Sequence, residues 1–250
     1  LTGLDRNDVI FIDEIHRLNR SVEEILYSAM EDYQLDIMIG KGPSARSIRL
    51  DLNPFTLVGA TTRSGFIGAP LRNRFGMIME MEFYSEMDLK QIIQRSAGLL
   101  DTSITEEAAL LLARRSRGTP RIANRLLRRV RDVVTIEGGR EITIDTVQSA
   151  MTLMSIDEDG LDAMDKKILT VLIENYHGGP AGLKAIAASV GIEPETISEV
   201  YEPFLLQTGF LVRTNRGRMV TDKAYRHLGR TEEGGSGLLW NFDTGNQDEV

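Results

Sequence analysis

An apolar run that ends in two adjacent carboxylates constrains the fold of this chain more than any other feature. Residues 9–12 read Val-Ile-Phe-Ile and are followed directly by Asp13 and Glu14. A strand that is apolar on both faces is typical of the centre of a parallel sheet, where carboxyl ends face a ligand crevice. There the first acid would hold Mg²⁺ and the second would polarise an attacking water. Alternatively, both acids merely begin a helix, whose amino end favours negative charge.

Further polar residues follow in an order that favours the first interpretation. The run FTLVGA ends in Thr61 and Thr62, and a polar side chain at the tip of a neighbouring strand would position the water. An arginine of PLRNRFG would reach a phosphate of an adjacent subunit, and Arg121, in RGTPR, would contact the same phosphates from the start of a helix. Each motif is common alone, but their order is specific.

This succession resembles the Walker B, sensor 1, arginine finger and sensor 2 motifs of the AAA+ ATPases. Within that group, FIDEIHRL, GATTR, PLRNRFG, RGTPRIANRLLRRVRD and GFLVRTNRGR together resemble the RuvB family. These proteins are the ATP-driven motors of Holliday junction branch migration in DNA recombination and repair. The resemblance covers the chain from Val9 to about Gly229.

The resemblance implies ATP and Mg²⁺ as cofactors, a homo-hexameric ring of like subunits, and a role for each matching residue. Asp13 would be the Mg²⁺-side carboxylate and Glu14 the catalytic one, with Arg74 as the finger acting in the next subunit. The remaining residues expected near the nucleotide are Thr61 or Thr62 as sensor 1, Arg72 beside the finger, Arg121 as sensor 2, and Glu31, Asp32, Tyr33 and Tyr84. For the last four residues, a helix end and hinge packing are nearly as good an explanation.

The chain changes character three times along its length. Short β-rich runs, including FTLVGAT and MIMEMEF, alternate with a helical stretch over residues 20–32, which is an α/β pattern. Residues 86–155 read as helices throughout, with Thr105 as an N-cap. Residues 162–230 predict three helices and then two short strands around a turn, the outline of a winged helix-turn-helix.

We therefore expect an α/β fold, a partial AAA+ parallel sheet, followed by an all-α lid domain and a winged-helix domain. The Gly-rich and acidic end of the chain predicts a disordered tail. The expected boundaries are 1–84 for the ATPase part, 85–156 for the lid, 157–230 for the DNA-binding winged helix and 231–250 for the tail.

The stretch LDIMIGKGPSARSIRLDL predicts a β-hairpin with an apolar face. Its apolar residues are Ile37, Ile39, Ile48 and Leu50. Such a hairpin either packs into a core or serves as a docking site. The resemblance favours docking, because the family uses a hairpin at this place to bind RuvA, the partner that recognises the junction.

Three arginines crowd the predicted wing: Arg213, Arg216 and Arg218. Guanidinium groups there would grip the phosphates of duplex or Holliday junction DNA, in a salt-dependent manner. The alternative is a solvated basic turn.

One departure from the family pattern concerns Pro194, which occupies a place just before ETI where family members often carry a basic residue.

The P-loop of a nucleotide hydrolase, G-x-x-x-x-G-K-[ST], is missing from this sequence. GKGPSARS at 40–47 contains a Gly-Lys pair, but it follows the carboxylate strand and has the wrong spacing. Without amides and a lysine around the phosphates, tight ATP binding is not expected. Because the chain also opens on the loop-like LTGLDRND, we expect an amino-terminally truncated family member that is inactive by itself.

Composition excludes several classes of protein. The absence of cysteine excludes a disulfide framework and a thiolate metal site. With no leader and no long apolar run, a cytoplasmic location is expected. The net charge of −8 argues against a wholly basic nucleic-acid coat. Two alternatives remain. One is a non-catalytic winged-helix DNA-binding or oligomerisation module. The other is a clamp-loader-like AAA+ adaptor, which the predicted wing argues against, because such an adaptor would end in a helical collar.

Overall fold

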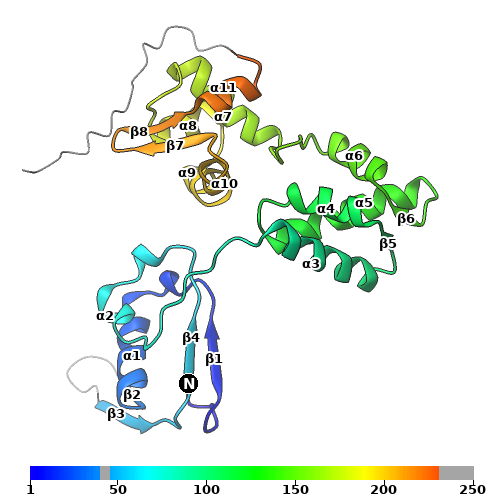
Figure 1. The fold of residues 1–250 in the computed structure, drawn as a ribbon. Coiled ribbons are helices and arrows are strands. Elements are labelled where there is room, and N and C mark those ends of the chain that lie inside the picture. Colours follow the sequence, from blue (N-terminus) through cyan, green and yellow to red (C-terminus); the bar gives the residue numbers. More distant parts are fainter. Residues whose placement is uncertain (40–45, 231–250) are drawn as a thin grey trace, which may run out of the picture. The chain divides into compact units, whose positions relative to one another are not determined.

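The computed structural model describes residues 1–39 and 46–230, which belong to two compact units, Leu1–Met81 and Glu82–Val250 (Figure 1). Each unit is described by itself below. The predicted tail, 231–250, and the turn of the predicted hairpin lie outside the described residues.

In the first unit, strands β1 (Val9–Ile12) and β4 (Thr56–Gly59) pair in parallel, with Val9 opposite Thr56 and Ile12 opposite Gly59. The ladder continues past both strands, since Ala60 N–H donates to Ile12 O and Ile15 N–H donates to Ala60 O. The carboxyl ends of the two strands therefore lie at one edge, as the sequence predicted. The short 3₁₀ helix η1 (Ile15–Arg17) follows β1 directly.

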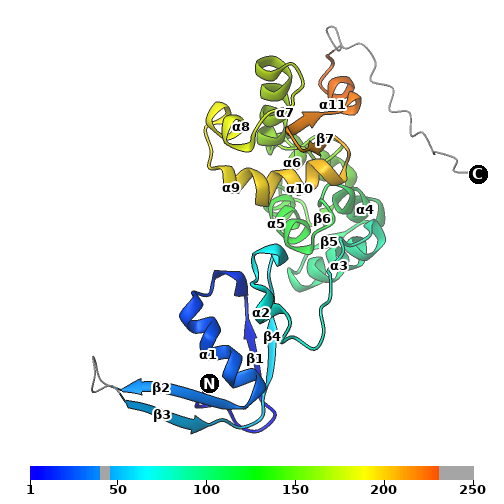
Figure 2. The same ribbon diagram turned by 90° about the vertical axis from the view of Figure 1, so that its left-hand side faces the viewer.

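Helix α1 (Arg20–Glu31) begins where the Asn19 side chain accepts a hydrogen bond from Val22 N–H. It is followed by the predicted hairpin, in which β2 (Gln34–Ile39) pairs antiparallel with β3 (Arg46–Asp51). Figure 2 shows the hairpin extending beyond α1. A 3₁₀ turn, η3 (Ser64–Phe66), and the single turn α2 (Ala69–Arg72) complete the unit.

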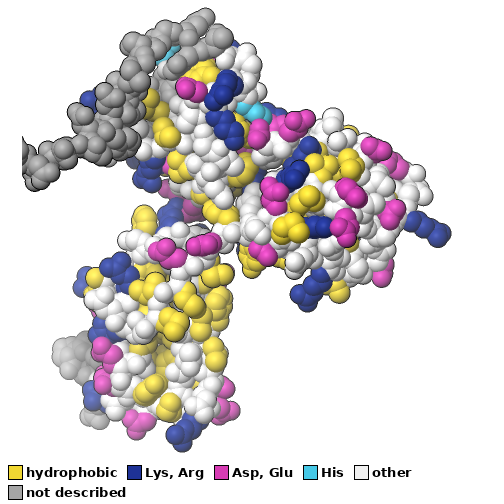
Figure 3. All heavy atoms as spheres, in the orientation of Figure 1, with side chains coloured by type: hydrophobic (Ala, Val, Ile, Leu, Met, Phe, Trp, Pro, Cys, Tyr) yellow, Lys and Arg dark blue, Asp and Glu magenta, His cyan; other side chains and the backbone are white. Residues whose placement is uncertain are grey.

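Two expectations about the sheet were wrong for the described residues. Strand β1 was expected at the centre of a buried sheet, but β1 and β4 pair only with each other, and Val9 and Phe11 are 64% and 60% exposed. Figure 3 shows hydrophobic side chains gathered over this part of the unit. The run MIMEMEF, 77–83, forms no strand, because no described strand offers it a ladder of hydrogen bonds.

The lid region begins the second unit with α3 (Glu86–Leu99), α4 (Glu106–Arg114), α5 (Pro120–Ile136) and α6 (Ile144–Leu153). Thr105 caps α4 by accepting a hydrogen bond from Ala108 N–H, which confirms the predicted N-cap. The region is not helical throughout: β5 (Ser103–Ile104) and β6 (Glu141–Ile142) form a two-residue parallel pair. So short a pair carries no alternating pattern that the sequence could reveal.

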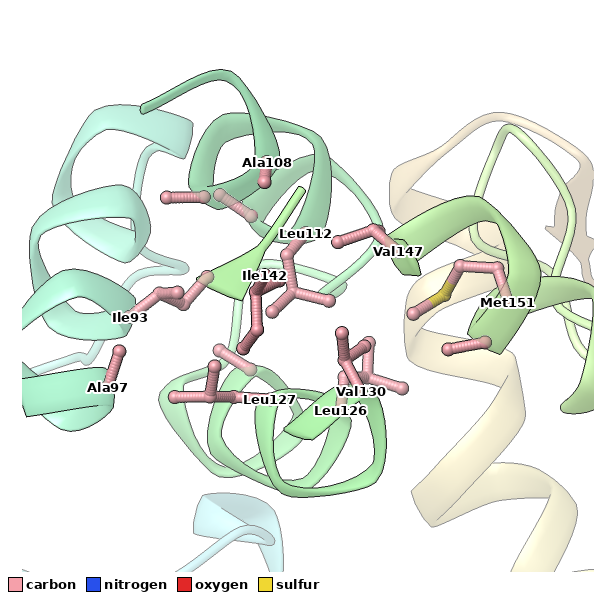
Figure 4. Close-up of a cluster of buried hydrophobic side chains, with 14 of the residues drawn as sticks. Ile93, Ala97, Ala108, Leu112, Leu126, Leu127, Val130, Ile142, Val147 and Met151 are labelled. Atoms are coloured by element: carbon pink, nitrogen blue, oxygen red, sulfur yellow. The ribbon is translucent and has the colours of Figure 1, made fainter. Parts of the chain in front are cut away.

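The lid helices are held together by one apolar core (Figure 4). Ile93 from α3, Leu112 from α4, Leu127 and Val130 from α5, and Ile142 from β6 are all fully buried there. Burying a side chain of this size stabilises the fold by about 1.5–3 kcal/mol. Burial of Ile142 in this core therefore anchors β6, and β5 is held through its pairing with β6.

The winged-helix region consists of α7 (Ala163–Tyr176), α8 (Leu183–Val190), a third helical segment and a β-hairpin. The third segment is divided into α9 (Pro194–Thr196), a π-helical turn η4 (Ile197–Tyr201) and α10 (Glu202–Gln207). The wing consists of β7 (Leu211–Thr214) and β8 (Gly217–Val220), paired antiparallel as predicted. A further helix that the sequence did not predict, α11 (Asp222–His227), follows the wing.

A buried ionic cluster joins the lid to the winged-helix region. Arg117, between α4 and α5, forms ion pairs with Asp165 and, at 3.1 Å, with Asp162 at the start of α7. Its Nε–H donates to Gly160 O at 3.1 Å, and its guanidinium lies 4.6 Å from the centre of the Phe204 ring. With Arg117 9% exposed and Asp165 fully buried, the cluster is shielded from solvent.

Among the described residues, no helix is both long enough and apolar enough to cross a membrane.

Candidate functional site

Glu14 and Thr62 meet at the edge where β1 and β4 end. The Thr62 hydroxyl donates to the Glu14 carboxylate at 3.2 and 3.3 Å, and the Thr62 amide donates to it at 3.3 Å. Glu14 adopts a left-handed backbone conformation, φ 48° and ψ 47°, which turns the chain sharply after the strand. Non-glycine residues rarely adopt this conformation, and such outliers cluster at functional sites.

The electrostatic surroundings keep Glu14 ionised. The hydrogen bond from the Thr62 amide is the largest influence and lowers the pKa of the Glu14 carboxyl below its ordinary value, against a smaller opposing effect of desolvation. The Thr62 hydroxyl and the positive charges of His16 and Arg17 act in the same lowering direction. An ionised carboxylate can accept a hydrogen bond from a water and polarise it.

His16 is part of this site, although the sequence did not identify it. Its Nδ1 lies 2.9 Å from Thr61 Oγ1 and 3.1 Å from a carboxylate oxygen of Glu14, and its side chain is 7% exposed. The imidazole therefore joins the tips of both strands. The one sequence feature that could have identified His16 is its position two residues after Glu14, in the first turn after the strand.

Asp13 fits the role of a Mg²⁺-side carboxylate. It is exposed, and one of its oxygens accepts a hydrogen bond from Glu14 N–H at 3.0 Å, which orients the group. The described residues contain no cluster of three acidic, histidine or cysteine side chains that would enclose a metal. Mg²⁺ does not need such a cage, because it binds through one or two carboxylates together with waters and substrate phosphates.

Arg74 lies at the opposite end of β4. Its guanidinium lies 3.1 Å from a carboxylate oxygen of Glu31 and donates a hydrogen bond to Pro70 O at 2.8 Å. The guanidinium carbon lies over the Tyr27 ring, 4.4 Å from the ring centre. Arg74 and Tyr33 line a hollow of about 220 Å³ beside Thr56 and Leu57, where β4 begins. The structure thus brings Arg74, Glu31 and Tyr33 together, but it does not bring them to Glu14 of the same chain.

The other predicted nucleotide residues are exposed. Asp32 is the C-cap of α1, and Arg72 ends α2. In the second unit, Tyr84 N–H donates to Gly118 O at 2.9 Å, and Arg121 lies in the first turn of α5. Tyr84 and Arg121 therefore belong to the same part of the lid.

The wing presents two unpaired arginines and one paired arginine. Arg213 and Arg216 are exposed, and neither forms an ion pair within the described part of the chain. Arg218 is held by both carboxylate oxygens of Glu202, at 3.1 and 3.0 Å. The sequence did not reveal this partner, because Glu202 lies in a different element and reads as one of several acids there.

The hairpin has an exposed apolar face. Ile37 and Ile48 are directly opposite in the ladder, and Leu50 faces Leu35 two positions along, so all of these side chains are on one face. Ile37, Ile48 and Leu50 are 37%, 45% and 37% exposed. The backbone of Ile39, the last residue of β2, pairs with Arg46 in the ladder. The structure therefore leaves this face uncovered rather than packed in a core.

Three successive family models match the chain. Residues 1–81 match the Holliday junction DNA helicase RuvB P-loop domain, residues 84–157 match the RuvB AAA lid domain, and residues 158–229 match the RuvB C-terminal winged helix domain. Together these matches cover almost the whole chain.

Individual proteins agree with the family models. A "Holliday junction branch migration complex subunit RuvB" of Kosmotoga olearia is 74% identical over 240 residues, which are 96% of this chain and 70% of that protein. Its namesake in Thermosipho melanesiensis is 66% identical over 92% of this chain and 73% of that protein. A solved structure, the Thermotoga maritima RuvB Holliday junction branch migration motor, is 55% identical with a TM-score of 0.83, and the match covers 92% of this chain and 72% of the other.

Proposed function

The chain belongs to the RuvB family, and from this membership we propose that it is a subunit of the Holliday junction branch-migration motor, which couples ATP hydrolysis to translocation of duplex DNA. One observation carries the proposal. Three family matches follow one another over residues 1–229: a P-loop domain, a lid domain and a winged-helix domain. This is the order expected for a motor domain, a nucleotide-sensing lid and a DNA-binding domain. Recombination and repair in the cytoplasm would be its setting.

The hydrolytic part of the function would use Asp13, Glu14 and Thr62. Bound Mg²⁺ would neutralise charge on the phosphates, with Asp13 on its ligand side. Glu14, ionised and held by the Thr62 amide and hydroxyl, would polarise the attacking water. His16 would hold the side chains of Thr61 and Glu14 in fixed positions, because its imidazole lies within hydrogen-bond distance of both.

The finger would act between subunits. Arg74, with Arg72 beside it, lies at the amino end of β4, whereas Glu14 and Thr62 lie beyond its carboxyl end. A guanidinium in that position would reach phosphates next to Glu14 only from another copy of the chain, which supports a ring of like subunits, a hexamer by family resemblance. Near the shared nucleotide we place Thr61, Arg121 and the remaining predicted residues, Glu31, Asp32, Tyr33 and Tyr84.

The wing would bind DNA by its phosphates. Arg213, Arg216 and Arg218 supply positive charge, while the helix that reads bases in many winged-helix proteins exposes Glu195 and Glu199. Carboxylates on that helix would repel the phosphates that flank a groove. Binding is therefore expected to depend on salt and to be insensitive to sequence, as a translocating motor requires.

The exposed hairpin face with Ile37, Ile48 and Leu50 would dock RuvA, together with Ile39, which the sequence alternation assigns to the same face. Support comes from its exposure and from the direct pairing of Ile37 with Ile48. The proposed domains are 1–84 for the ATPase part, 85–156 for the lid and 157–230 for the winged helix.

This chain by itself would bind ATP weakly. Its 250 residues contain no G-x-x-x-x-G-K-[ST] motif, so no backbone cradle and lysine would hold the β and γ phosphates. A dissociation constant for Mg²⁺-ATP in the micromolar range, measured by calorimetry, would contradict this part of the proposal.

The test is ATP hydrolysis and DNA binding by this chain, with and without four-way junction DNA and RuvA, beside the Glu14→Gln variant. We expect salt-dependent DNA binding and negligible hydrolysis. Hydrolysis that disappears in Glu14→Gln would keep the motor role and reject the weak-ATP proposal. Binding that ignores both RuvA and junction structure would instead favour a non-catalytic winged-helix module.

A further inference from the structure

Two arginines of the wing share one face at close range. In the β7–β8 ladder Arg213 is directly opposite Arg218, so the two side chains project from the same side of the hairpin. Like charges placed directly opposite destabilise an antiparallel pair. A wing that keeps both arginines on this face therefore needs a negative charge nearby.

Glu202 supplies that charge from a different element. Arg218 Nε–H donates to Glu202 Oε1 at 3.1 Å, and Arg218 Nη2–H donates to Oε2 at 3.0 Å. This is the two-bond arrangement in which a guanidinium and a carboxylate are held in a fixed plane. Glu202 is 3% exposed, so it is removed from solvent and is not one more surface acid.

The helix bearing Glu202 is irregular at the place that orients this residue. The π-helical turn η4 immediately precedes Glu202, the first residue of α10. A π turn inserts an extra residue into a helix and rotates everything after it, and such turns are frequent at functional sites. On this segment Glu195 and Glu199 are exposed, whereas Glu202 faces the wing.

Arg218 is fixed at both its backbone and its side chain. Its N–H donates to Ala181 O at 2.8 Å, and its carbonyl accepts from Ala181 N–H at 2.9 Å. A guanidinium has five N–H donors, and Glu202 engages only Nε–H and one hydrogen of Nη2, so both hydrogens of Nη1 and one of Nη2 remain. Arg218 can therefore keep Glu202 and still donate to a phosphate on the face that it shares with Arg213.

We propose that Glu202 is a positioning residue for DNA binding: it holds Arg218 next to Arg213, so that the wing meets the phosphates with a preformed pair of guanidinium groups. Glu202 itself does not touch DNA. The inference rests on the proposed DNA-binding function of the wing and names the residue that gives the wing its geometry.

The test compares Glu202→Gln with the wild-type chain for binding to duplex and four-way junction DNA, measured by fluorescence anisotropy over a range of salt. Charge alone predicts that removing a carboxylate near DNA tightens binding, whereas positioning predicts the opposite. Loss of one phosphate contact lowers the slope of log K against log salt by about 0.9, which weakens binding about fivefold at 0.15 M salt.

Glu195→Gln is the matched control, because it makes the same charge change at an exposed position of the same segment. It is expected to bind DNA as tightly as wild type or more tightly. If Glu202 acts through Arg218, Glu202→Gln has no further effect on affinity in an Arg218→Gln background. Wild-type or tighter binding by Glu202→Gln overturns the inference.

A second variant keeps the test valid if Glu202→Gln lowers the stability of the fold. Replacing both partners, Glu202→Leu with Arg218→Met, leaves no unpaired buried charge at this place and is expected to preserve the circular dichroism spectrum. This double variant should bind DNA as weakly as Arg218→Gln, and wild-type affinity would reject the inference. A wild-type chain that does not bind DNA in a salt-dependent way would instead refute the proposed function itself.

Discussion

The buried carboxyl of Asp165 predicts an unusual pH dependence of stability. Asp165 is fully buried, and burial raises its pKa to about 7, although the Arg117 guanidinium beside it opposes the shift. One guanidinium faces two carboxylates here, because Arg117 also pairs with Asp162. We therefore expect the cluster to carry one proton on Asp165 at pH 5 and to lose it near neutral pH.

The sign follows from the raised pKa. Between pH 4 and 7 the folded chain binds this proton more tightly than the unfolded chain, so the free energy of unfolding falls as pH rises through that window. The shift from 3.8 to about 7 corresponds to roughly 4 kcal/mol in total, of which about 2.5 kcal/mol separates pH 5 from pH 7.5. For a protein of this size, that difference equals about 5–10 °C in Tm.

Asp165→Asn is the perturbation that isolates this effect. Asparagine keeps an acceptor oxygen for Arg117 and for the amide of Asp162, but it cannot ionise. The variant should match wild type at pH 5 and exceed it by about 2.5 kcal/mol at pH 7.5. Urea unfolding followed by circular dichroism at 222 nm reports mainly on Glu82–Val250, where most of the described helices lie.

The contributions of other groups are removed by the comparison. Glu14, Glu106 and Asp157 have lowered pKa values, so they titrate below this window in both proteins. Parallel pH profiles for wild type and Asp165→Asn would refute the reasoning. A ¹³C NMR titration that places the Asp165 carboxyl below pH 5 would refute it directly.

Three further predictions concern the wing, the lid core and the hairpin. Gly217→Ala should destabilise the winged helix by more than about 2 kcal/mol, because the φ of Gly217 is 147° and an added Cβ would lie 2.4 Å from Ala181 O. Thermal unfolding tests this loss of stability. The variant should also lose salt-dependent DNA binding, measured by fluorescence anisotropy. Leu112→Ala should cost about 3 kcal/mol in urea unfolding, since the side chain is fully buried in the lid core. Ile48→Lys should leave the Tm within 1–2 °C of wild type (about 0.5 kcal/mol) but abolish RuvA capture in a pull-down, whereas Arg20→Ala, an exposed change on α1, should preserve capture.

Local patterns in the sequence predicted the elements that depend on neighbouring residues. The acids after β1, the threonines after β4 and the Thr105 cap are all read within a few positions of an apolar run. The paired strands β5 and β6 were missed because their register depends on residues nearly forty positions apart. The run 77–83 was predicted as a strand from its composition, yet composition does not supply a partner.

The site was predictable in its residue types but not in its partners. Glu14 and Thr62 could be placed at one edge because parallel strands align their carboxyl ends. The roles of His16 and Glu202 depend on side chains that fold back from other elements, which no spacing rule reveals. Both residues are polar, shielded from solvent and within hydrogen-bond distance of a residue that the sequence did identify.

The motif RGTPR shows why burial has to be known before roles are assigned to its arginines. Arg117 has a left-handed backbone, φ 52°, which directs the side chain into the cluster with Asp162 and Asp165. Arg121, four residues later, lies on the exposed first turn of α5. One arginine therefore ties the lid to the winged helix, while the other is exposed to solvent. Residue type and spacing do not distinguish these two arginines, since both belong to one five-residue motif; only the contacts of Arg117 with Asp162 and Asp165 do.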